Sequence, residues 1–264
     1  MTKRTRSVGF TGEETTFMEK GLKKELCVVT GAAKGIGRAV AERFLEEGAD
    51  LVVADYDEAE LRRVYEGNPQ IAGIVKIDAT KISDLEKLAD AVKKTGRPVR
   101  AVLPTVGNGP NNMIPDITPE EFHLTMDLNV FSSFFTVQKL LPYMKKGSAI
   151  VLISSIAGFQ GGKNALVYNA AKAAVRSMAR SLAGELAEYG IRANAISPGP
   201  TDTGGFADFV DHNEDTRNNI ISMIPLGHIG KPQEIAAVAC FLASDEASYV
   251  TGAEVITDGG FTNR

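Results

Sequence analysis

Residues 26–37 read LCVVT-GAAKGIG, an apolar run of five residues that leads directly into a turn with three glycines. Ile36, Val40 and Phe44 follow at intervals of four, which is the spacing of one helical face. Glycines between a strand and a helix let the backbone approach a pyrophosphate at the positive end of the helix. The stretch therefore predicts a dinucleotide-binding strand–turn–helix unit. The spacing is G-x-x-x-G-x-G rather than G-x-G-x-x-G, so a purely structural glycine turn is the alternative.

The same alternation of strand and helix continues along the chain. Further strands are expected at the apolar runs 51–54, 71–77, 99–103, 149–153, 191–196 and 253–257. Helices are expected from Ser83 with Glu86, from Thr118 with Pro119 to about residue 145, over 164–188, and after Pro232. Nearly continuous apolar strands that alternate with helices predict a single-domain α/β fold. We expect a Rossmann-type, doubly wound parallel β-sheet with helices on both faces, preceded by a polar extension at residues 1–23.

Composition excludes several functional classes. The net charge is −4 with both signs mixed, which argues against nucleic-acid binding. There is no apolar run of membrane-spanning length and no targeting segment, so we expect a cytoplasmic protein with no membrane partner. Cys27 and Cys240 lie in apolar surroundings and are expected to be buried thiols rather than a disulfide. The three histidines are scattered and the acids show no ligand spacing, so no metal site is expected.

Asp55 ends the second apolar run, about 20 residues after the glycines. A carboxylate at this place accepts hydrogen bonds from the adenosine ribose hydroxyls and repels a 2′-phosphate. Lys34, within the glycine turn, acts in the opposite direction because a cation attracts that phosphate. We give Asp55 the greater weight and predict NAD, with NADP less favoured. The alternative is that Asp55 only starts the next helix.

Tyr168 and Lys172 are four residues apart and share one helical face. A phenol has a pKa of about 10 and is a poor base at neutral pH. An ammonium group about 4 Å away favours the phenolate and is expected to lower the tyrosine pKa by up to about 3 units. The pair then predicts proton transfer at neutral pH. The alternative is an ordinary pair on a helix surface.

Taken together, the motifs resemble those of the short-chain dehydrogenase/reductase family, in its compact single-domain branch. The matching segments are 30–37, Asp55, Asp78-Ala79, Asn129, Ser154-Ser155, Tyr168 with Lys172, Pro198-Gly199 with Thr203, and Asp258-Gly259-Gly260. The resemblance covers about residue 25 to the end and implies an NAD-binding domain over residues 24–264. It implies an NAD(H)-dependent oxidoreductase that interconverts a secondary alcohol and a carbonyl by hydride transfer. A non-catalytic NAD(H)-binding sensor or scaffold is the alternative.

The resemblance also implies a catalytic tetrad, with Ser155 preferred to Ser154 because it stands thirteen residues before the tyrosine. Ser155 would orient the substrate oxygen, and Tyr168 would be the general acid/base. Lys172 would lower the tyrosine pKa and hold the nicotinamide ribose, while Asn129 would position a water that leads to solvent. The implied cofactor contacts are Gly31, Lys34, Gly35, Ile36, Gly37, Asp55, Asp78, Ala79, Gly107, Tyr168, Lys172, Pro198, Gly199, Thr201 and Thr203.

One segment departs from the family pattern. The family has Asn-Asn-Ala-Gly after the fourth strand, where this chain has Pro104-Thr105-Val106-Gly107. The first Asn normally ties neighbouring strands together, and proline cannot, so weaker local stability and cofactor affinity are expected.

Substrate and assembly are less defined by the sequence. Polar residues in 108–113 and 159–164 would suit a sugar or polyol, but we prefer the interpretation that they are solvated loop residues. The resemblance implies that the two helices after Thr118 and Asn164 pair between subunits in a homotetramer or homodimer.

Overall fold

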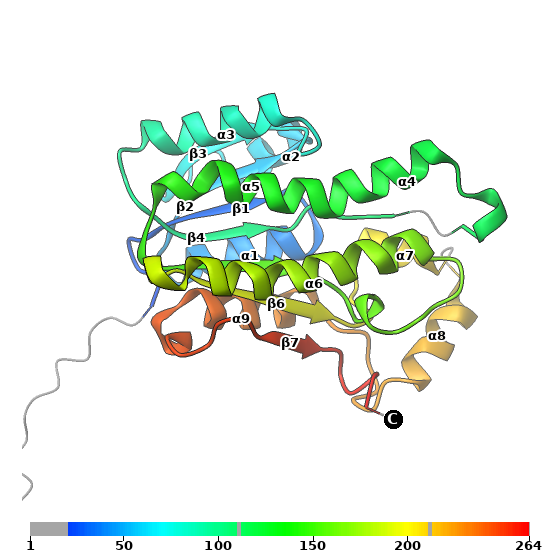
Figure 1. Cartoon of the computed structure of the whole chain (residues 1–264). Helices are drawn as coiled ribbons and strands as arrows, with labels where there is room; N and C mark the ends of the chain where they lie inside the picture. The colour runs from blue at the N-terminus through cyan, green and yellow to red at the C-terminus, as the bar shows by residue number, and fades with distance from the viewer. Residues whose placement is uncertain (1–20, 110–111, 211–212, 264) are drawn as a thin grey trace, which may run out of the picture.

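Seven apolar strands pair side by side into one parallel sheet, within a computed structural model that describes residues 21–109, 112–210 and 213–263 (Figure 1). The strands are β1 (Leu26–Thr30), β2 (Asp50–Asp55), β3 (Ile71–Lys76), β4 (Val99–Pro104), β5 (Met144–Ile153), β6 (Arg192–Pro198) and β7 (Glu254–Thr257). Their order is β3-β2-β1-β4-β5-β6-β7, and every pairing is parallel. The order reverses between β1 and β4, and ligands of such sheets bind at this point, beyond the carboxyl ends of the strands.

Helices cover both faces because successive strand residues point to opposite sides of the sheet. One core cluster joins Cys27 and Val29 of β1 to α1 (Gly35–Glu46), α2 (Glu58–Tyr65) and α9 (Pro232–Ala243). A second cluster joins Leu26 and Val28 to α3 (Ile82–Lys94), α5 (Ser132–Leu140) and α6 (Leu166–Leu186). The prediction of a doubly wound α/β domain is confirmed.

Three further helices lie beyond the carboxyl ends of the strands: α4 (Pro119–Met126), α7 (Gly204–Phe209) and α8 (Glu214–Ser222) (Figure 1). Thr118 caps α4 with the predicted capping box, since it accepts from the Glu121 amide while the Glu121 carboxylate accepts from the Thr118 amide. These helices extend the molecule on the side where a ligand is expected.

The helix expected from Thr118 to about residue 145 is not continuous. It is interrupted by a π-helical turn at Asp127–Phe131, α5 ends at Leu140, and β5 already begins at Met144. Pro142 lies in the 3-10 turn between α5 and β5. The helix does not continue through it, because proline has no amide hydrogen to donate.

Three other expected boundaries are corrected. Asn164 has φ 63°, a left-handed conformation that no helix interior allows, so α6 begins at Leu166. The capping box expected at Ser83 is wrong, because α3 begins at Ile82 with Lys81 as its N-cap. Leu22 is fully buried in the core, so the packed domain starts before residue 24, while residues 1–20 of the expected extension lie outside the described residues.

The described residues contain no helix long and apolar enough to cross a membrane, and no group of three metal-ligating side chains. Cys27 and Cys240 are both buried and free, as expected. Burial raises the pKa of the Cys27 thiol and raises that of Cys240 to about 11, so both thiols keep their protons.

Candidate active site

The turn between β1 and α1 depends on its glycines. Gly31 and Gly35 have φ values of 70° and 56°, which side chains rarely adopt. A Cβ atom on Gly37 would lie 2.1 Å from the carbonyl oxygen of Gly31 and 2.3 Å from Oγ1 of Thr105. Lys34, the N-cap of α1, makes no side-chain capping bond. The turn therefore presents the first amide groups of a helix at close range, which is the arrangement that binds phosphate.

Asp55 holds the same turn from β2. Its Oδ2 accepts from the amide of Ala33 at 3.0 Å, and its Oδ1 accepts from the amide of Asp57 at 3.1 Å. The N-cap of α2 is Asp57, whose side chain accepts from the Glu60 amide. The interpretation that Asp55 only starts the next helix is therefore wrong. A carboxylate bonded to the glycine turn stands where a ribose next to the pyrophosphate would reach it.

The strands on either side of the switch point are tied together by Thr105. Its hydroxyl donates to the carbonyl oxygen of Thr30 at 2.6 Å, and its amide donates to the same oxygen at 3.3 Å. The weaker local stability expected at Pro104 is therefore compensated, because the next residue, Thr105, supplies the side-chain link between β4 and β1. Sequence reasoning weighed Pro104 and did not credit the hydroxyl that follows it.

Asn129 lies in the π-helical turn between α4 and α5 and is fully buried. Its Nδ2 donates to the carbonyl oxygens of Thr125 and Asn108, each at 2.7 Å. Its Oδ1 is buried and has no hydrogen-bond partner among the described residues. A buried, unpaired acceptor is costly unless a water or ligand satisfies it. The side chain therefore both interrupts the helix and leaves one acceptor for a bound group.

Gly107 brings this acceptor next to the lysine of α6. A Cβ atom on Gly107 would lie 2.5 Å from Oδ1 of Asn129 and 2.9 Å from Nζ of Lys172. The two atoms therefore flank the same backbone position after β4. An acceptor and a cation at one place fit a shared water or a sugar hydroxyl.

The two serines at the end of β5 have different environments. Ser154 is buried and donates to the carbonyl oxygen of Lys172 at 2.8 Å, which is a structural bond. Ser155 is partly exposed, accepts from the Ala157 amide at 3.2 Å and hydrogen-bonds the phenol of Tyr168. Ser155, rather than Ser154, therefore faces the tyrosine.

The charge relationship between Tyr168 and Lys172 differs from the sequence expectation. Nζ of Lys172 donates to the carbonyl oxygen of Ile153 at 2.9 Å and lies 5.5 Å from the centre of the Tyr168 ring. Burial raises the pKa of Tyr168, and the bond with Ser155 offsets part of the rise. The prediction that Lys172 lowers the tyrosine pKa is therefore wrong for these residues alone, because burial disfavours the phenolate more strongly.

Burial also lowers the pKa of Lys172 from 10.5 to about 8, which makes stability depend on pH. The unfolded chain binds this proton more tightly than the folded protein does, so the free energy of unfolding rises as pH increases from about 8 towards 10.5. Relative to Lys172→Met, we expect the wild type to gain about 1 kcal/mol between pH 7 and pH 9. Urea unfolding of both proteins at the two pH values measures this. Unfolding energies that change in parallel would contradict it.

The remaining expected cofactor residues form two groups, and the first lies at the end of β6 and in the segment that leads to α7. Thr203 caps α7 and lies against the glycine turn, since a Cβ atom on Gly35 would be 3.5 Å from its methyl group. Further residues on this side are Pro198 at the end of β6, Gly199, which packs against Asp258, and Thr201, whose hydroxyl donates to the Gly199 carbonyl oxygen at 2.9 Å. Ile36 lies in the first turn of α1.

Asp78 and Ala79 form the second group, beyond the end of β3. The Asp78 carboxylate accepts from the hydroxyl of Thr80 at 2.6 Å and pairs with Lys81 at 3.0 Å, and these contacts lower its pKa. Ala79 is buried in the core. The carboxylate of Asp78 is thus engaged in its own turn rather than against the glycines.

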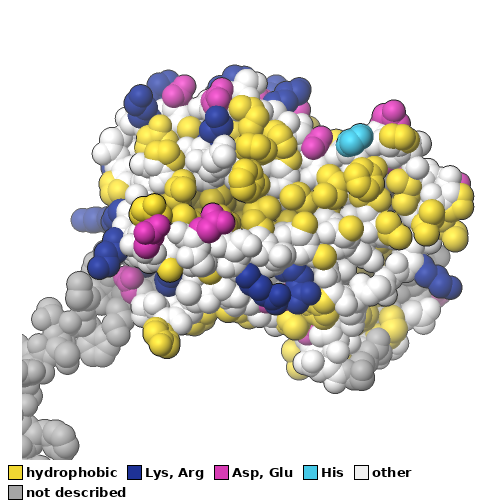
Figure 2. Space-filling model, in the orientation of Figure 1, with side chains coloured by type: hydrophobic (Ala, Val, Ile, Leu, Met, Phe, Trp, Pro, Cys, Tyr) yellow, Lys and Arg dark blue, Asp and Glu magenta, His cyan; other side chains and the backbone are white. Residues whose placement is uncertain are grey.

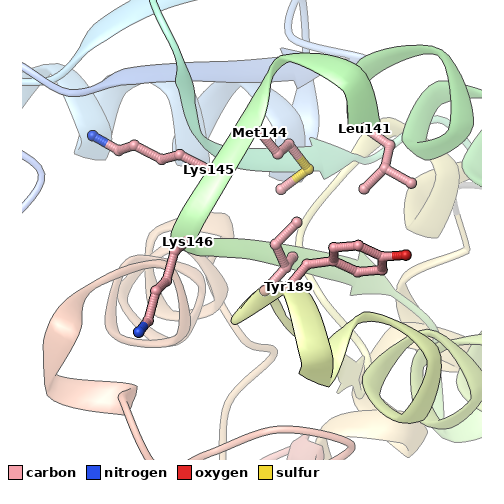
Figure 3. A pocket seen from close by; sticks show the side chains of 6 residues that line it. Leu141, Met144, Lys145, Lys146 and Tyr189 are labelled. Atoms are coloured by element: carbon pink, nitrogen blue, oxygen red, sulfur yellow. The ribbon is translucent and has the colours of Figure 1, made fainter.

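The surface has one hollow beside the glycine turn and a second cavity far from it. A hollow of about 520 Å³ lies beside the turn, where α1, α7 and α9 begin, and is lined by Gly35, Arg38, Thr203, Gly204 and Pro232 among others. A cavity of about 370 Å³ at the opposite, amino end of β5 is lined by Leu141, Met144, Lys145, Lys146, Tyr189 and Ile191 (Figure 3). Figure 3 shows both lysine side chains directed away from the apolar residues that line this cavity.

The residues that converge on the switch point fit a dinucleotide. The glycine turn leaves no room for a Cβ at Gly37, Asp55 is bonded to that turn, and Asn129 keeps an unpaired acceptor near Lys172. Sequence reasoning missed Asp57, Thr105 and the Asn108 carbonyl. Asp57 alone left a signal, since Asp57-x-x-Glu60 is a helix-start pattern.

Comparison with known proteins places these features in context. A family model described as enoyl-(acyl carrier protein) reductase matches residues 31–262. The chain is 35% identical to the NADP-dependent (R)-specific alcohol dehydrogenase of Lentilactobacillus kefiri, covering 93% of this chain and 99% of that protein. It is 37% identical to the NAD-dependent glycerol dehydrogenase of Listeria innocua, covering 90% and 94%. A solved short-chain dehydrogenase/reductase structure from Brucella melitensis, titled glucose/ribitol dehydrogenase, matches with a TM-score of 0.87, 33% identity and coverage of 92% and 99%.

Proposed function

The chain belongs to the short-chain dehydrogenase/reductase family of oxidoreductases, and we propose that it interconverts a secondary alcohol and a carbonyl compound with NAD(H). The observation that carries the proposal is the meeting of Ser155, Tyr168, Lys172 and Asn129 beyond the carboxyl ends of β4 and β5. Ser155 bonds the phenol, and Lys172 shares the space at Gly107 with Asn129. Tyr168 and Lys172 come from α6, Ser155 follows β5 and Asn129 lies in the π-helical turn, and together they provide an acid/base, an orienting hydroxyl and a path for the proton.

Each side chain has a part that its surroundings support. Tyr168 keeps its proton at neutral pH and can donate it to a carbonyl oxygen that Ser155 orients. Lys172 is buried behind the tyrosine, and its pKa of about 8 lets it pass a proton near neutral pH. The open acceptor of Asn129 would receive a water next to that lysine. Tyr168 and Lys172 would also hold the ribose of a bound nicotinamide, which would supply or take up the hydride.

Further contacts would hold the dinucleotide. The amides at Gly31, Gly35, Ile36 and Gly37 would bind its pyrophosphate, and Asp55 would accept from the adenosine ribose. Gly107 permits close approach on the other side of the switch point. The remaining expected contacts are Lys34, Asp78, Ala79, Pro198, Gly199, Thr201 and Thr203.

NAD is the proposed cofactor because Asp55 accepts from the Ala33 amide of the turn with one carboxylate oxygen and from the Asp57 amide with the other, so its carboxylate is held in place. A carboxylate held there repels the 2′-phosphate of NADP. The relatives include an NADP-dependent and an NAD-dependent enzyme, so the preference rests on Asp55 and not on the similarity.

The function is tested by absorbance at 340 nm across a panel of secondary alcohols, polyols, sugars and ketones, with NAD and NADP in parallel. We expect turnover with NAD and at least one panel member. Tight NADH binding without turnover by any member would favour the non-catalytic sensor or scaffold, which no observation here supports. Product formation without a change in cofactor absorbance would indicate an elimination or epimerisation instead.

We also propose that the enzyme is a homotetramer or homodimer that pairs through α4, α5 and α6. Figure 2 shows hydrophobic side chains gathered across the face that these helices form. Phe122, Leu124, Phe134 and Leu166 are each more than two-fifths exposed on them. Exposed apolar surface of this kind marks a protein interface. Light scattering at micromolar concentration should give a multiple of 28.2 kDa, and a monomeric mass would overturn the proposal.

A further inference from the structure

An ion pair lies at the edge of the glycine turn. Nζ of Lys34 is 2.9 Å from Oδ2 of Asp57, which follows β2 by two residues. Lys34 is the cation of the turn, and its neighbour Ala33 donates to Asp55. The pair therefore lies beside the carboxylate that is proposed to select NAD.

Asp57 is the fixed partner of the pair. Its Oδ1 accepts from the Glu60 amide at 3.1 Å as the cap of α2, and its own amide donates to Asp55 at 3.1 Å. Its side chain is 27% exposed, whereas that of Lys34 is 69% exposed. A flexible lysine is thus drawn to an anchored carboxylate, so its resting position is set by Asp57.

The other charged side chains near Lys34 are paired with one another, so Asp57 is the counter-ion of Lys34. Glu60 is bonded by Arg63 at 2.6 Å, and Arg38 is bonded to Glu42 at 2.7 Å. These groups have partners of their own, so loss of the Asp57 charge would leave Lys34 without its present counter-ion.

We infer that Asp57 is a specificity-determining residue, which disfavours NADP(H) by holding Lys34 away from the 2′-phosphate. The inference rests on the proposed function and adds to it. Asp55 excludes the phosphate by repulsion, and Asp57 removes the cation that would otherwise attract it. Lys34 is therefore a latent phosphate ligand rather than evidence for NADP.

Asp57→Asn tests this without removing the helix cap, because asparagine caps as well as aspartate does. NADH and NADPH are titrated separately into the protein, and binding is followed by nicotinamide fluorescence, so no substrate is needed. We expect NADPH to bind about tenfold more tightly, the gain for one new charge-assisted hydrogen bond to phosphate. NADH affinity should change less than about twofold, which also confirms that the site is folded.

The same substitution in a Lys34→Met background identifies the cation. There, Asp57→Asn should strengthen NADPH binding by less than about threefold, because only a nearby negative charge is lost. An unchanged NADPH affinity in Asp57→Asn, or an equal gain in both backgrounds, would overturn the inference. Wild-type protein that binds NADPH more tightly than NADH would instead refute the proposed NAD preference, and this outcome is seen before any variant is made.

Discussion

Replacing Tyr168 by phenylalanine should lower kcat/KM by about 10²- to 10⁴-fold, the usual contribution of a positioned general acid/base. The ring packs against Gly109, where a Cβ atom would lie 3.2 Å from Cδ2 of the tyrosine ring, and phenylalanine keeps that packing. Only the hydroxyl that hydrogen-bonds Ser155 is removed. The rate is measured at 340 nm with a substrate identified in the panel, and NADH affinity is measured on the same preparation.

Tyr189→Phe provides the matched control. Tyr189 is 59% exposed and lies at the cavity on the amino side of the sheet, away from Ser155. Its variant should keep the wild-type rate. If Tyr168→Phe retained hydride transfer within threefold of the wild type, the phenol would not be the proton-transfer group and the proposed mechanism would be refuted.

Replacing Gly37 by alanine is expected to weaken NADH binding at least 100-fold and to lower the free energy of unfolding by about 1–3 kcal/mol. The added methyl group would meet the Gly31 carbonyl oxygen at 2.1 Å and the Thr105 hydroxyl at 2.3 Å. The first contact is with backbone, so the glycine turn must shift. The second contact displaces the hydroxyl that bonds β4 to β1.

Gly184→Ala makes the same chemical change within a helix where nothing lies within 4 Å of the new atom. It should leave NADH binding unchanged and stabilise the chain by about 0.5–1 kcal/mol, because alanine is the better helix former. Calorimetric unfolding and NADH titration of both variants give the comparison. Wild-type NADH affinity in Gly37→Ala would show that the turn does not approach the pyrophosphate.

The strands were predictable because burial on both faces requires continuous apolar runs. The run at 26–30 coincides with β1, and the runs at 51–54 and 99–103 differ from β2 and β4 by a residue at their ends. Helix ends were less predictable. In the π-helical turn, the side-chain amide of Asn129 donates to the Thr125 carbonyl oxygen, and this contact depends on the side chain being buried.

The residues of the site also fall into those that the sequence predicted and those that only the structure shows. The glycine turn, Asp55 and the Tyr168–Lys172 pair were visible as short spacings in the chain. The bond from Thr105 to Thr30 spans 75 residues and the pair of Lys34 and Asp57 spans 23, so neither follows from local pattern. Sequence spacing also placed Lys172 close enough to Tyr168 to acidify it, whereas the fold directs its Nζ to the Ile153 carbonyl oxygen.

By itself, the sequence determined the class of fold, the order of its elements and the residue types that can carry proton transfer, because these depend on periodicity and composition along the chain. Only the tertiary structure decided which charges meet and how far burial shifts the pKa values of Tyr168 and Lys172. The physical reason is that pairing and desolvation depend on distance through space and on exclusion of water, and packing sets both only after distant segments have come together.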